Sequence, residues 1–460
     1  MASNSMYLEP TVVDFIETAH RRIQTQIPVP ESMPMFERLE AVETRAMHGQ
    51  LPVVWDRAEN FQVYDPWGNC WIDFTSTIFV ANAGHGNPKI REALLKTIQK
   101  PLLHSYTYLT EERLDYIEYL IKNTPKQFEK AFLLSAGTEA TEVALKLMRL
   151  RGRKTSPTKL KVICFEGNWH GRTLGAQMMG FNPAQKDWVG YLDPNIHHLS
   201  FPYPWREESK DGEAFFHAKI TEFMAQNNVD PKKDICGFML ETFQGWGAIF
   251  YPKSFVQALA RFAKENDILL VFDEMQAGFA RTGKLFGYMH YEVEPDMICL
   301  GKGASSGLPL SIVLGPADIM DLPDIGSMSS THSANPLVCV AGKANLEYIL
   351  DNGLAQQSER LGKIMHQKLN AIKNEFPNHV SDIFGIGLLA ALVCNTPERK
   401  PLPQLCDKIC TLALQRGLLL VHTGRESIKL APPLTITEAA LIEGVDVLHQ
   451  AVRDAVALLT

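Results

Sequence analysis

Four stretches of the chain place chemically capable side chains directly after an apolar run. Lys302 follows "MICLG", Asp273 ends "ILLVFD", and Trp169 with His170 follows "LKVICFEGN". The fourth stretch, "SAGT" at 135–138, follows "AFLL" and opens a helical pattern. Taken singly, a charged strand end is usually a solvated tip and an aromatic one usually covers the sheet edge. The group as a whole therefore matters more than any one member.

These four kinds of group together fit one cofactor, pyridoxal phosphate. Small residues at a helix N-terminus let backbone N–H groups reach a phosphate, although Ser or Thr there is also an ordinary N-cap. A flat aromatic side chain offers a face to a ring. A carboxylate favours a protonated pyridine nitrogen, and burial lets a lysine lose its proton and attack an aldehyde. The constellation predicts pyridoxal phosphate bound covalently by Lys302.

The elements that must position these residues follow an alternating pattern between about residues 131 and 316. Apolar, β-branched runs lie at 131–137, 160–167, 234–241, 268–275, 297–303 and 310–316. Helical patterns separate several of them, which predicts an α/β fold whose mainly parallel central sheet is flanked by helices. The last two runs are too close for a helical crossover, so we expect the last strand to be antiparallel. Because ligands bind beyond the carboxyl ends of parallel strands, the four stretches should meet.

The two flanks of the chain read differently. Residues 61–77 predict a hairpin around "DPWGN". The tail from about 340 carries amphipathic helices, a strand pair around 386–393 and a closing helix from Glu438. We expect a second, smaller α+β domain built from both chain ends. The predicted division is an N-terminal segment at 1–80, a large cofactor-binding domain at 81–335 and a C-terminal small domain at 336–460.

Composition narrows the possible partners and location. The chain has 460 residues and a net charge of −7, which argues against nucleic acid or an anionic membrane as a partner. No apolar stretch is long enough to span a bilayer, and the N-terminus lacks the features of a secretory signal. The eight cysteines are scattered without metal-ligand spacing. We therefore expect a reduced, cytoplasmic protein without a metal.

Several motifs resemble, in order, those of one family. "LLSAGTEATEVALKLMR", "WHGRTLGA", "DEMQAGFARTGKLF" with the following "GKG", and "STHSANPLVCVAG" resemble the class III (subgroup II, ornithine/GABA-type) aminotransferases of pyridoxal-phosphate fold type I. The likeness spans roughly residues 35–455. It implies an enzyme that moves an amino group between a primary amine or amino acid and a 2-oxo acid through a Lys302 Schiff base. It also implies a homodimer with shared active sites, and leaves a tetramer open.

The resemblance assigns roles where positions match. Lys302 and Asp273 would be catalytic, as the covalent anchor and proton shuttle and as the partner of the ring nitrogen. Gln276 would hydrogen-bond the 3-hydroxyl oxygen, Met275 would pack one ring face, and Thr331 would reach the neighbouring subunit's phosphate. The implied cofactor-binding residues are Ala136, Gly137, Thr138, Trp169, His170, Asp273, Met275, Gln276, Lys302 and Thr331.

Two departures from the family pattern concern the substrate. Many relatives pair a Glu with an Arg, but here Trp246 in "ETFQGWGA" and Lys429 in "ESIKLAPPL" occupy these positions. Lysine cannot grip a carboxylate with two parallel hydrogen bonds as arginine can. Neutral drift at a rim position would also explain the swap. We expect Arg172, Trp246 and Lys429 to bind substrate, with Arg425 a weaker candidate.

Because Trp246 and Lys429 replace the usual Glu and Arg, the sequence defines the type of reaction less closely than it defines the fold. An amino-acid racemase or epimerase, or a decarboxylating aminotransferase, uses the same scaffold and the same lysine. These reactions differ in which bond of the substrate's α-carbon is aligned with the ring. The aminotransferase is the expected activity, and the racemase or epimerase is the alternative.

Overall fold

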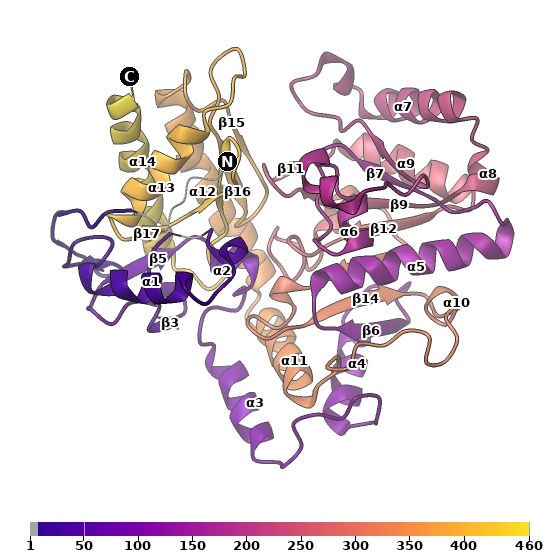
Figure 1. The fold of residues 1–460 in the computed structure, drawn as a ribbon, viewed down its shortest axis with the longest axis horizontal. Coiled ribbons are helices and arrows are strands. Elements are labelled where there is room, and N and C mark those ends of the chain that lie inside the picture. Colours follow the sequence, from indigo (N-terminus) through magenta and orange to yellow (C-terminus); the bar gives the residue numbers. More distant parts are fainter. Residues whose placement is uncertain (1–7, 50, 460) are drawn as a thin grey trace. The chain divides into compact units, whose positions relative to one another are not determined.

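The chain divides into two compact units (Figure 1). The structure is a computed structural model that describes residues 8–49 and 51–459. Unit 1 comprises the described parts of Met1–Asn87, Trp246–Ala248 and Gln356–Thr460, and unit 2 comprises Pro88–Gly245 and Ile249–Ala355. Unit 1 therefore joins both ends of the chain, and unit 2 holds its middle.

A seven-stranded sheet forms the centre of unit 2. Its strands, in spatial order, are β6 (Lys130–Leu134), β14 (Ser311–Gly315), β13 (Met297–Leu300), β12 (Leu269–Asp273), β9 (Ile235–Glu241), β7 (Lys161–Phe165) and β8 (Ile196–Leu199). Only β14 runs antiparallel to its neighbours. The six apolar runs are therefore strands, and the predicted direction of the last one is confirmed.

Strand β8 is the one strand of this sheet that the sequence reading missed. Its residues, "IHHL", hold two histidines, and the run is too short and polar to register as a buried strand. Both histidines are half-buried, and Nε2 of His198 lies 2.8 Å from the carbonyl oxygen of Met179. An edge strand pairs on one side only, so it needs less apolar character than the central strands.

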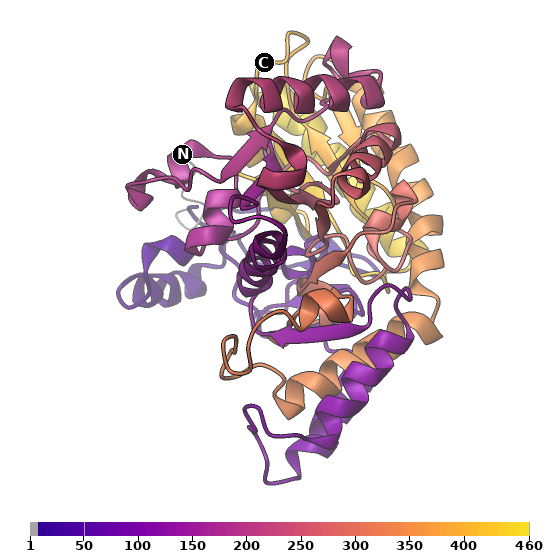
Figure 2. The ribbon, with the colours of Figure 1, turned by 90° about the vertical axis from the view of Figure 1, so that its right-hand side faces the viewer.

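Helices α3 (Pro88–Ile98), α4 (Glu111–Lys122) and α11 (Pro336–Asp351) lie side by side within unit 2 (Figure 2). Thr110 caps the first turn of α4 by accepting the N–H of Arg113. Lys89 on α3 forms ion pairs of 3.0 Å with Glu347 and Asp351 on α11. Shorter α-helices of this unit are α6 (Leu174–Met179), which contacts β8, α8 (Pro231–Asp234), and α10 (Ala317–Met320), which contacts β6 and β14.

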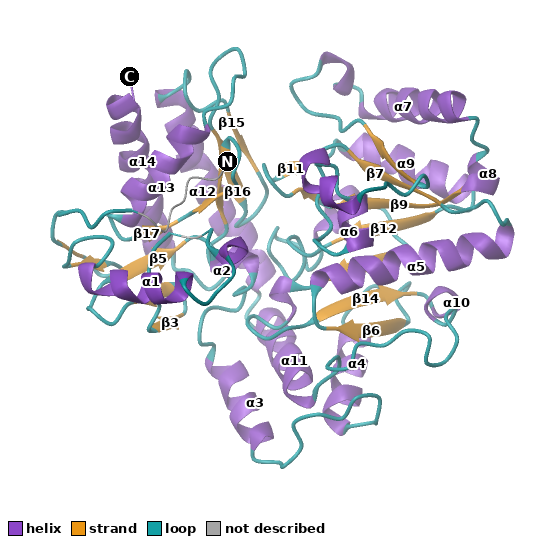
Figure 3. Cartoon of the chain, viewed as in Figure 1, coloured by secondary structure: helices purple, strands orange, loops and turns teal. Residues whose placement is uncertain are grey.

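Helices cover both faces of the central sheet (Figure 3). Strand residues alternate between the faces. Cys164 packs in the cluster formed with α5 (Gly137–Thr155), whereas its neighbour Phe165 meets the ring of Phe255 on α9 (Lys253–Glu265). Phe216 on α7 (Gly212–Asn227) contacts the same ring. This two-sided burial explains why the central strands read as continuous apolar runs.

Unit 1 contains two sheets and several helices. One sheet holds β1 (Ile16–Glu17), β2 (Arg22–Ile23), β5 (Cys70–Asp73), β4 (Gln62–Tyr64) and β3 (Arg57–Glu59), with β17 (Leu418–Leu419) beside β5. The other holds β15 (Asp382–Phe384), β16 (Ala390–Val393), β19 (Ser427–Leu430) and β18 (Val421–His422). Its α-helices are α1 (Met33–Glu40), α2 (Ser76–Phe79), α12 (Leu354–Glu375), α13 (Pro403–Leu414) and α14 (Glu438–Leu459). The predicted hairpin around "DPWGN" is confirmed as β4–β5, and the closing helix begins at Glu438 as predicted.

The short segment α2 has an unusual backbone. Its four residues, Ser76–Phe79, all have positive φ values between 46° and 68°, so the turn is left-handed. Such a conformation costs a residue other than glycine about 1–2 kcal/mol. The Ser76 hydroxyl donates to the carbonyl oxygen of Ala431 at 2.6 Å and ties the turn to the residue that follows β19.

The described residues show neither cross-links nor a membrane-spanning helix. All eight cysteines are free thiols and all are buried. Burial raises the pKa of Cys236 and of Cys339 to about 12, which keeps both thiols protonated. Within residues 8–49 and 51–459, no helix combines the length and apolar character needed to cross a bilayer.

Candidate active site

A cavity of about 330 Å³ lies in unit 2 at the carboxyl ends of the parallel strands. Its lining residues are Gly137, Thr138, Trp169, His170, Gly171, Arg172, Glu241, Thr242, Phe243, Asp273, Met275, Gln276, Ala277 and Lys302. All predicted cofactor residues except Ala136 and Thr331 are among them, and so is Arg172. The structure therefore brings together the four stretches that the strand-end argument had grouped.

Asp273 is the last residue of β12, and its carboxylate is held from two sides. Oδ1 accepts the backbone N–H of Met275 at 3.0 Å, and Oδ2 lies 2.9 Å from Nδ1 of His170. The side chain is buried, so water does not compete for these oxygens. Each oxygen keeps a second acceptor direction, which a protonated ring nitrogen can use.

Lys302 follows β13 in a strained backbone conformation. Its φ is +43°, in the left-handed region that residues with a Cβ seldom adopt. Such strain is typical of functional positions. Burial lowers the pKa of Lys302, and the negative charges of Asp273 and Glu241 oppose this shift. Burial is the larger effect, so the lysine loses its proton more easily than one in water, as a nucleophile must.

Met275 fills a space that two glycines leave open. A Cβ on Gly137 would lie 2.8 Å from the Met275 sulfur, and a Cβ on Gly301 would lie 2.5 Å from it. Both distances are shorter than real contacts of a Cβ atom. A Cβ at either position would therefore displace the Met275 thioether from this wall of the cavity.

Helix α5 begins at the cavity. Oε2 of Glu139 accepts the backbone N–H groups of Ser135 and Ala136, at 2.9 and 2.8 Å. This explains why Ala136 does not line the cavity, because its N–H points to the glutamate. The next two residues, Gly137 and Thr138, line it and present the positive end of the helix dipole. Such a helix end can hold an anion.

Trp169 is positioned by a residue that the sequence reading missed. Its backbone N–H donates to Oε1 of Glu241 at 3.0 Å, and the guanidinium carbon of Arg172 lies 4.6 Å from the centre of its ring. Glu241 ends β9 beside Asp273 on β12, in register with it. The strand-end argument applied to β9 would have found it, together with Thr242 and Phe243.

Thr331 lies outside the cavity lining. It is exposed in the loop before α11, and its carbonyl oxygen lies 2.7 Å from Nε2 of His104. Asn335, in the same loop, donates its side-chain amide to the carbonyl oxygen of Leu103. The Thr331 loop is thus bound to the segment between α3 and α4.

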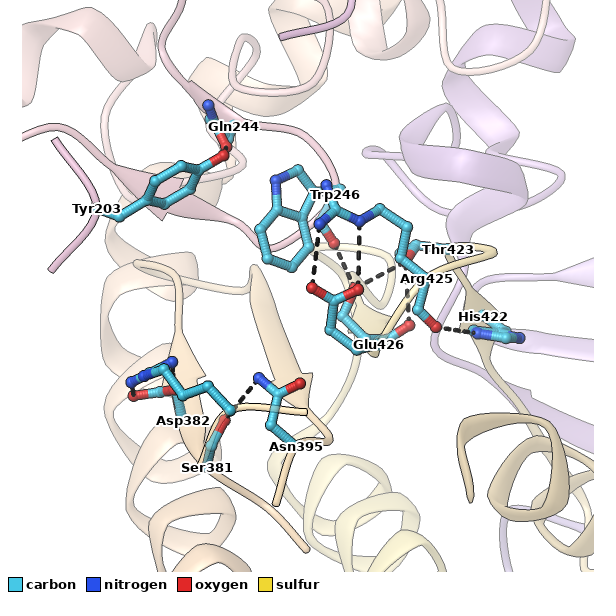
Figure 4. Close-up of polar contacts among 12 residues, drawn as sticks. Tyr203, Gln244, Trp246, Ser381, Asp382, Asn395, His422, Thr423, Arg425 and Glu426 are labelled. Carbon is cyan, nitrogen blue, oxygen red and sulfur yellow. Dashed lines mark hydrogen bonds and ion pairs between the residues drawn. The ribbon is translucent and has the colours of Figure 1, made fainter. Parts of the chain in front are cut away.

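Trp246 and Lys429 belong to unit 1, and each takes part in a pair between a cation and an aromatic ring. Figure 4 shows Trp246 beside Arg425 and Glu426. The guanidinium carbon of Arg425 lies 4.0 Å from the centre of the Trp246 ring, and Arg425 also forms an ion pair of 3.1 Å with Glu426. Nζ of Lys429 lies 4.1 Å from the centre of the Phe79 ring. We call these residues the cation–aromatic cluster of unit 1.

The residues of the cavity fit pyridoxal phosphate by their chemistry. The first turn of α5 suits a phosphate, Trp169 suits the ring, Asp273 suits the ring nitrogen, and Lys302 suits the aldehyde. The glycines at 137 and 301 keep the space beside Met275 open. A chain with these groups at one edge of a parallel sheet is a pyridoxal-phosphate-dependent transferase of fold type I.

Comparison with known proteins gives the family. Residues 44–452 match the class III aminotransferases, and the chain belongs to this family. Its members are pyridoxal-phosphate-dependent enzymes that move an amino group between an amine or amino acid and a 2-oxo acid. The suspected family, the fold class, the cofactor and the aminotransferase activity are confirmed.

Individual relatives include two reaction types. The chain is 30% identical to a 4-aminobutyrate aminotransferase of Mycobacterium leprae over 445 residues, 94% of this chain and 98% of that protein. It is 29% identical to an alanine/serine racemase of Pyrococcus horikoshii over 460 residues, 97% of this chain and 95% of that protein. Among solved structures, an acetylornithine aminotransferase of Elizabethkingia anophelis gives a TM-score of 0.76 at 27% identity and covers 92% of this chain and 99% of its own.

Proposed function

We propose that amino transfer takes place in the cavity of unit 2, with Lys302 and Asp273 as its catalytic residues. The observation that carries this proposal is that both line one cavity with Trp169 and the first turn of α5. Pyridoxal phosphate, when bound, supplies an aldehyde for the substrate's amine and a ring that accepts the electron pair released at its α-carbon.

Lys302 has two roles in this proposal. Its lowered pKa leaves Nζ unprotonated often enough to bond the aldehyde carbon. Once displaced by the substrate's amine, Nζ would be free to take the proton from the substrate's α-carbon and to return it two atoms away, as a 1,3-proton shift requires. The carboxylates of Asp273 and Glu241 favour the protonated form of Lys302 that exists between these two events.

The remaining predicted cofactor residues, within the lining and outside it, hold the cofactor in this proposal. Asp273 keeps the ring nitrogen protonated, because its charge favours the cationic form. Gln276 donates to the 3-hydroxyl oxygen, and Trp169 and Met275 pack the two ring faces. Gly137 binds the phosphate through its backbone N–H, with Thr138 beside it. Ala136 precedes them at the start of α5, and His170 holds Asp273. Thr331 reaches the phosphate of the neighbouring subunit.

We propose that Arg172, Trp246 and Lys429 select the substrate. Arg172 lines the cavity and offers a guanidinium to a carboxylate. Trp246 and Lys429 replace the Glu and Arg of many relatives, so the choice of carboxylate substrates should differ from theirs. The M. leprae relative is named for 4-aminobutyrate, which makes ω-amino acids the first donors to test.

The test is the absorption spectrum of the purified protein with pyridoxal phosphate. We expect a band from the lysine-bound cofactor that disappears when a donor amine is added without an acceptor, as the amino form of the cofactor accumulates. Lys302→Arg should lack the band. A natural chain that binds the cofactor without this band would contradict the proposal.

The alternative activity is amino-acid racemisation, favoured by the P. horikoshii relative. It predicts that the band persists after an amino acid is added, while the hydrogen on the substrate's α-carbon exchanges with solvent deuterium. Conversion of one enantiomer of alanine or serine to the other, without an acceptor, would establish it.

We also propose that the protein is a homodimer. Large apolar side chains are exposed along the α3–α4 segment: Leu95, Ile98, Leu102, Leu103, Tyr108 and Leu109, with Tyr108 at 78% exposure and Leu109 at 74%. Patches of this kind mark protein interfaces. The segment is bonded to the Thr331 loop, whose predicted partner is the other subunit's phosphate.

Sedimentation velocity tests the dimer. Tyr108→Glu with Leu109→Glu should convert dimer to monomer and raise the dissociation constant for pyridoxal phosphate. The matched control is Leu458→Glu with Leu459→Glu, two exposed leucines of α14. A monomeric natural chain would contradict the proposal. The eight free, buried thiols support a cytoplasmic location, which fractionation of the source cells would test.

A further inference from the structure

A third side chain extends the contact between Asp273 and His170. Nδ1 of His170 lies 2.9 Å from Oδ2 of Asp273, and Nε2 on the other side of the ring lies 2.7 Å from Nδ2 of Asn168. All three side chains are buried, with exposures of 6% or less. Neither the sequence reading nor the resemblance gave Asn168 a role.

The hydrogen bonds of this series define which ring nitrogen carries the proton. An ionised carboxylate can only accept, so Nδ1 of His170 carries a hydrogen and donates it to Asp273. In the neutral ring Nε2 is then an acceptor, and the side-chain amide of Asn168 provides the N–H that it needs. Turning that amide by 180° would place an oxygen against Nε2 and require protons on both nitrogens.

Two side chains contact that of Asn168. Oδ1 of Asn168 is buried and, within the described residues, has no hydrogen-bond partner, whereas the amide nitrogen contacts His170 and the side chain also contacts the thiol of Cys164. Burial lowers the pKa of His198 on β8 to about 4, and burial raises the pKa of Cys164 on β7.

We propose that Asn168 is a positioning residue for the amino transfer. By donating its amide N–H to Nε2, it holds His170 in the tautomer that donates from Nδ1, and so holds the Asp273 carboxylate toward the ring nitrogen. Its effect on catalysis rests on the proposed role of Asp273. Its effect on His170 does not, because it is a property of the protein without cofactor.

Nitrogen-15 NMR of histidine-labelled, cofactor-free protein tests this directly, with His170→Gln used to assign the signal. In the natural chain we expect a proton on Nδ1 and none on Nε2. Asn168→Leu keeps the volume but removes the donor, so His170 should become a mixture of tautomers. The dissociation constant for pyridoxal phosphate should rise about three- to tenfold. Asn182→Ala is the matched control, since it loses a local amide contact in the same segment and should change neither value.

Two results would overturn the proposal. One is a folded Asn168→Leu protein whose His170 tautomer and cofactor affinity match the natural chain. If that variant does not fold, Asn168→Asp provides the second test, because a carboxylate would accept from Nε2 and put protons on both ring nitrogens. An unchanged His170 signal there would refute the proposal. Failure of the natural chain to bind pyridoxal phosphate through Lys302 would instead contradict the proposed function and leave the tautomer result standing.

Discussion

The cavity of unit 2 and the cation–aromatic cluster of unit 1 hold their charged groups in different ways. Asp273 is fixed by directional hydrogen bonds from a backbone N–H and a buried histidine. Arg425 and Lys429 lie over the rings of Trp246 and Phe79, and Arg425 also donates to both carboxylate oxygens of Glu426. Attraction of a cation to a ring face adds about 0.5–2 kcal/mol to such contacts. The cavity matches the family motifs, whereas the cluster departs from them at Trp246 and Lys429.

The largest effect should come from the lysine of the cavity. We expect Lys302→Ala to lower kcat/KM at least about 10³-fold, because loss of a proton-transfer group alone costs about 10²–10⁴-fold. Steady-state kinetics measure it, with Lys284→Ala, an exposed lysine of the neighbouring motif, as the control. Comparable activity of the two variants would show that the cavity is not the catalytic region.

The next effect should come from the fixed carboxylate. Asp273→Asn keeps the shape but removes the charge that favours a protonated ring nitrogen, so kcat should fall about 10²–10³-fold. The absorption spectrum of the bound cofactor should shift as well. A variant within threefold of the natural kcat would show that the charge is unimportant, however well the side chain is held.

A third prediction concerns a carboxyl group beside the cavity. Burial raises the pKa of Glu274 to about 7 from an ordinary value of 4.5. The folded state therefore binds this proton more tightly, and its stabilising effect is complete below pH 4.5 and lost as the pH rises through 7. The unfolding free energy of the natural chain minus that of Glu274→Gln should therefore fall by up to about 3 kcal/mol between pH 4.5 and 8.

Urea unfolding of the cofactor-free protein at several pH values measures this difference. Glu118→Gln, at an exposed carboxyl of α4, is the control. A constant difference across the range would mean that Glu274 has an ordinary pKa in the folded protein.

The smallest effect should come from the cation–aromatic cluster of unit 1. Trp246→Glu with Lys429→Arg restores the pair found in many relatives and should raise kcat/KM for glutamate about tenfold, or 1.4 kcal/mol, through a bidentate grip. Each single variant should lack the gain, because it supplies only half of the pair. If the double variant matches the natural chain, substrate choice does not depend on these two positions.

The sequence was most informative where burial and strand direction decide the structure. The six apolar runs became strands of the central sheet, and the polar residues after β6, β7, β12 and β13 met at one edge as expected. The edge strand β8 was missed because its two histidines break the apolar signal. Glu241 was missed because only its place at the end of a strand was considered, although the polar side chains at the other strand ends were predicted to line the site.

Other features could not be read from the sequence because they depend on side-chain orientation. The contact of Asn168 with His170 depends on how the chain turns after β7. The pairing of Arg425 with Trp246 joins positions far apart in the chain. The family resemblance pointed to positions 246 and 429. It did not predict that Trp246 lies beside Arg425 or that Lys429 lies over Phe79.

The left-handed turn at Ser76–Phe79 limits how this chain can be redesigned. Glycine would adopt such a backbone at the lowest cost in free energy, yet the residues here are Ser, Thr, Ile and Phe. Phe79 lies under Lys429, and the Ser76 hydroxyl anchors the turn. A mutant library at Thr77 and Ile78 should therefore be enriched in Gly, Asn and Asp among its folded members. Such a library would show which residues this handedness permits.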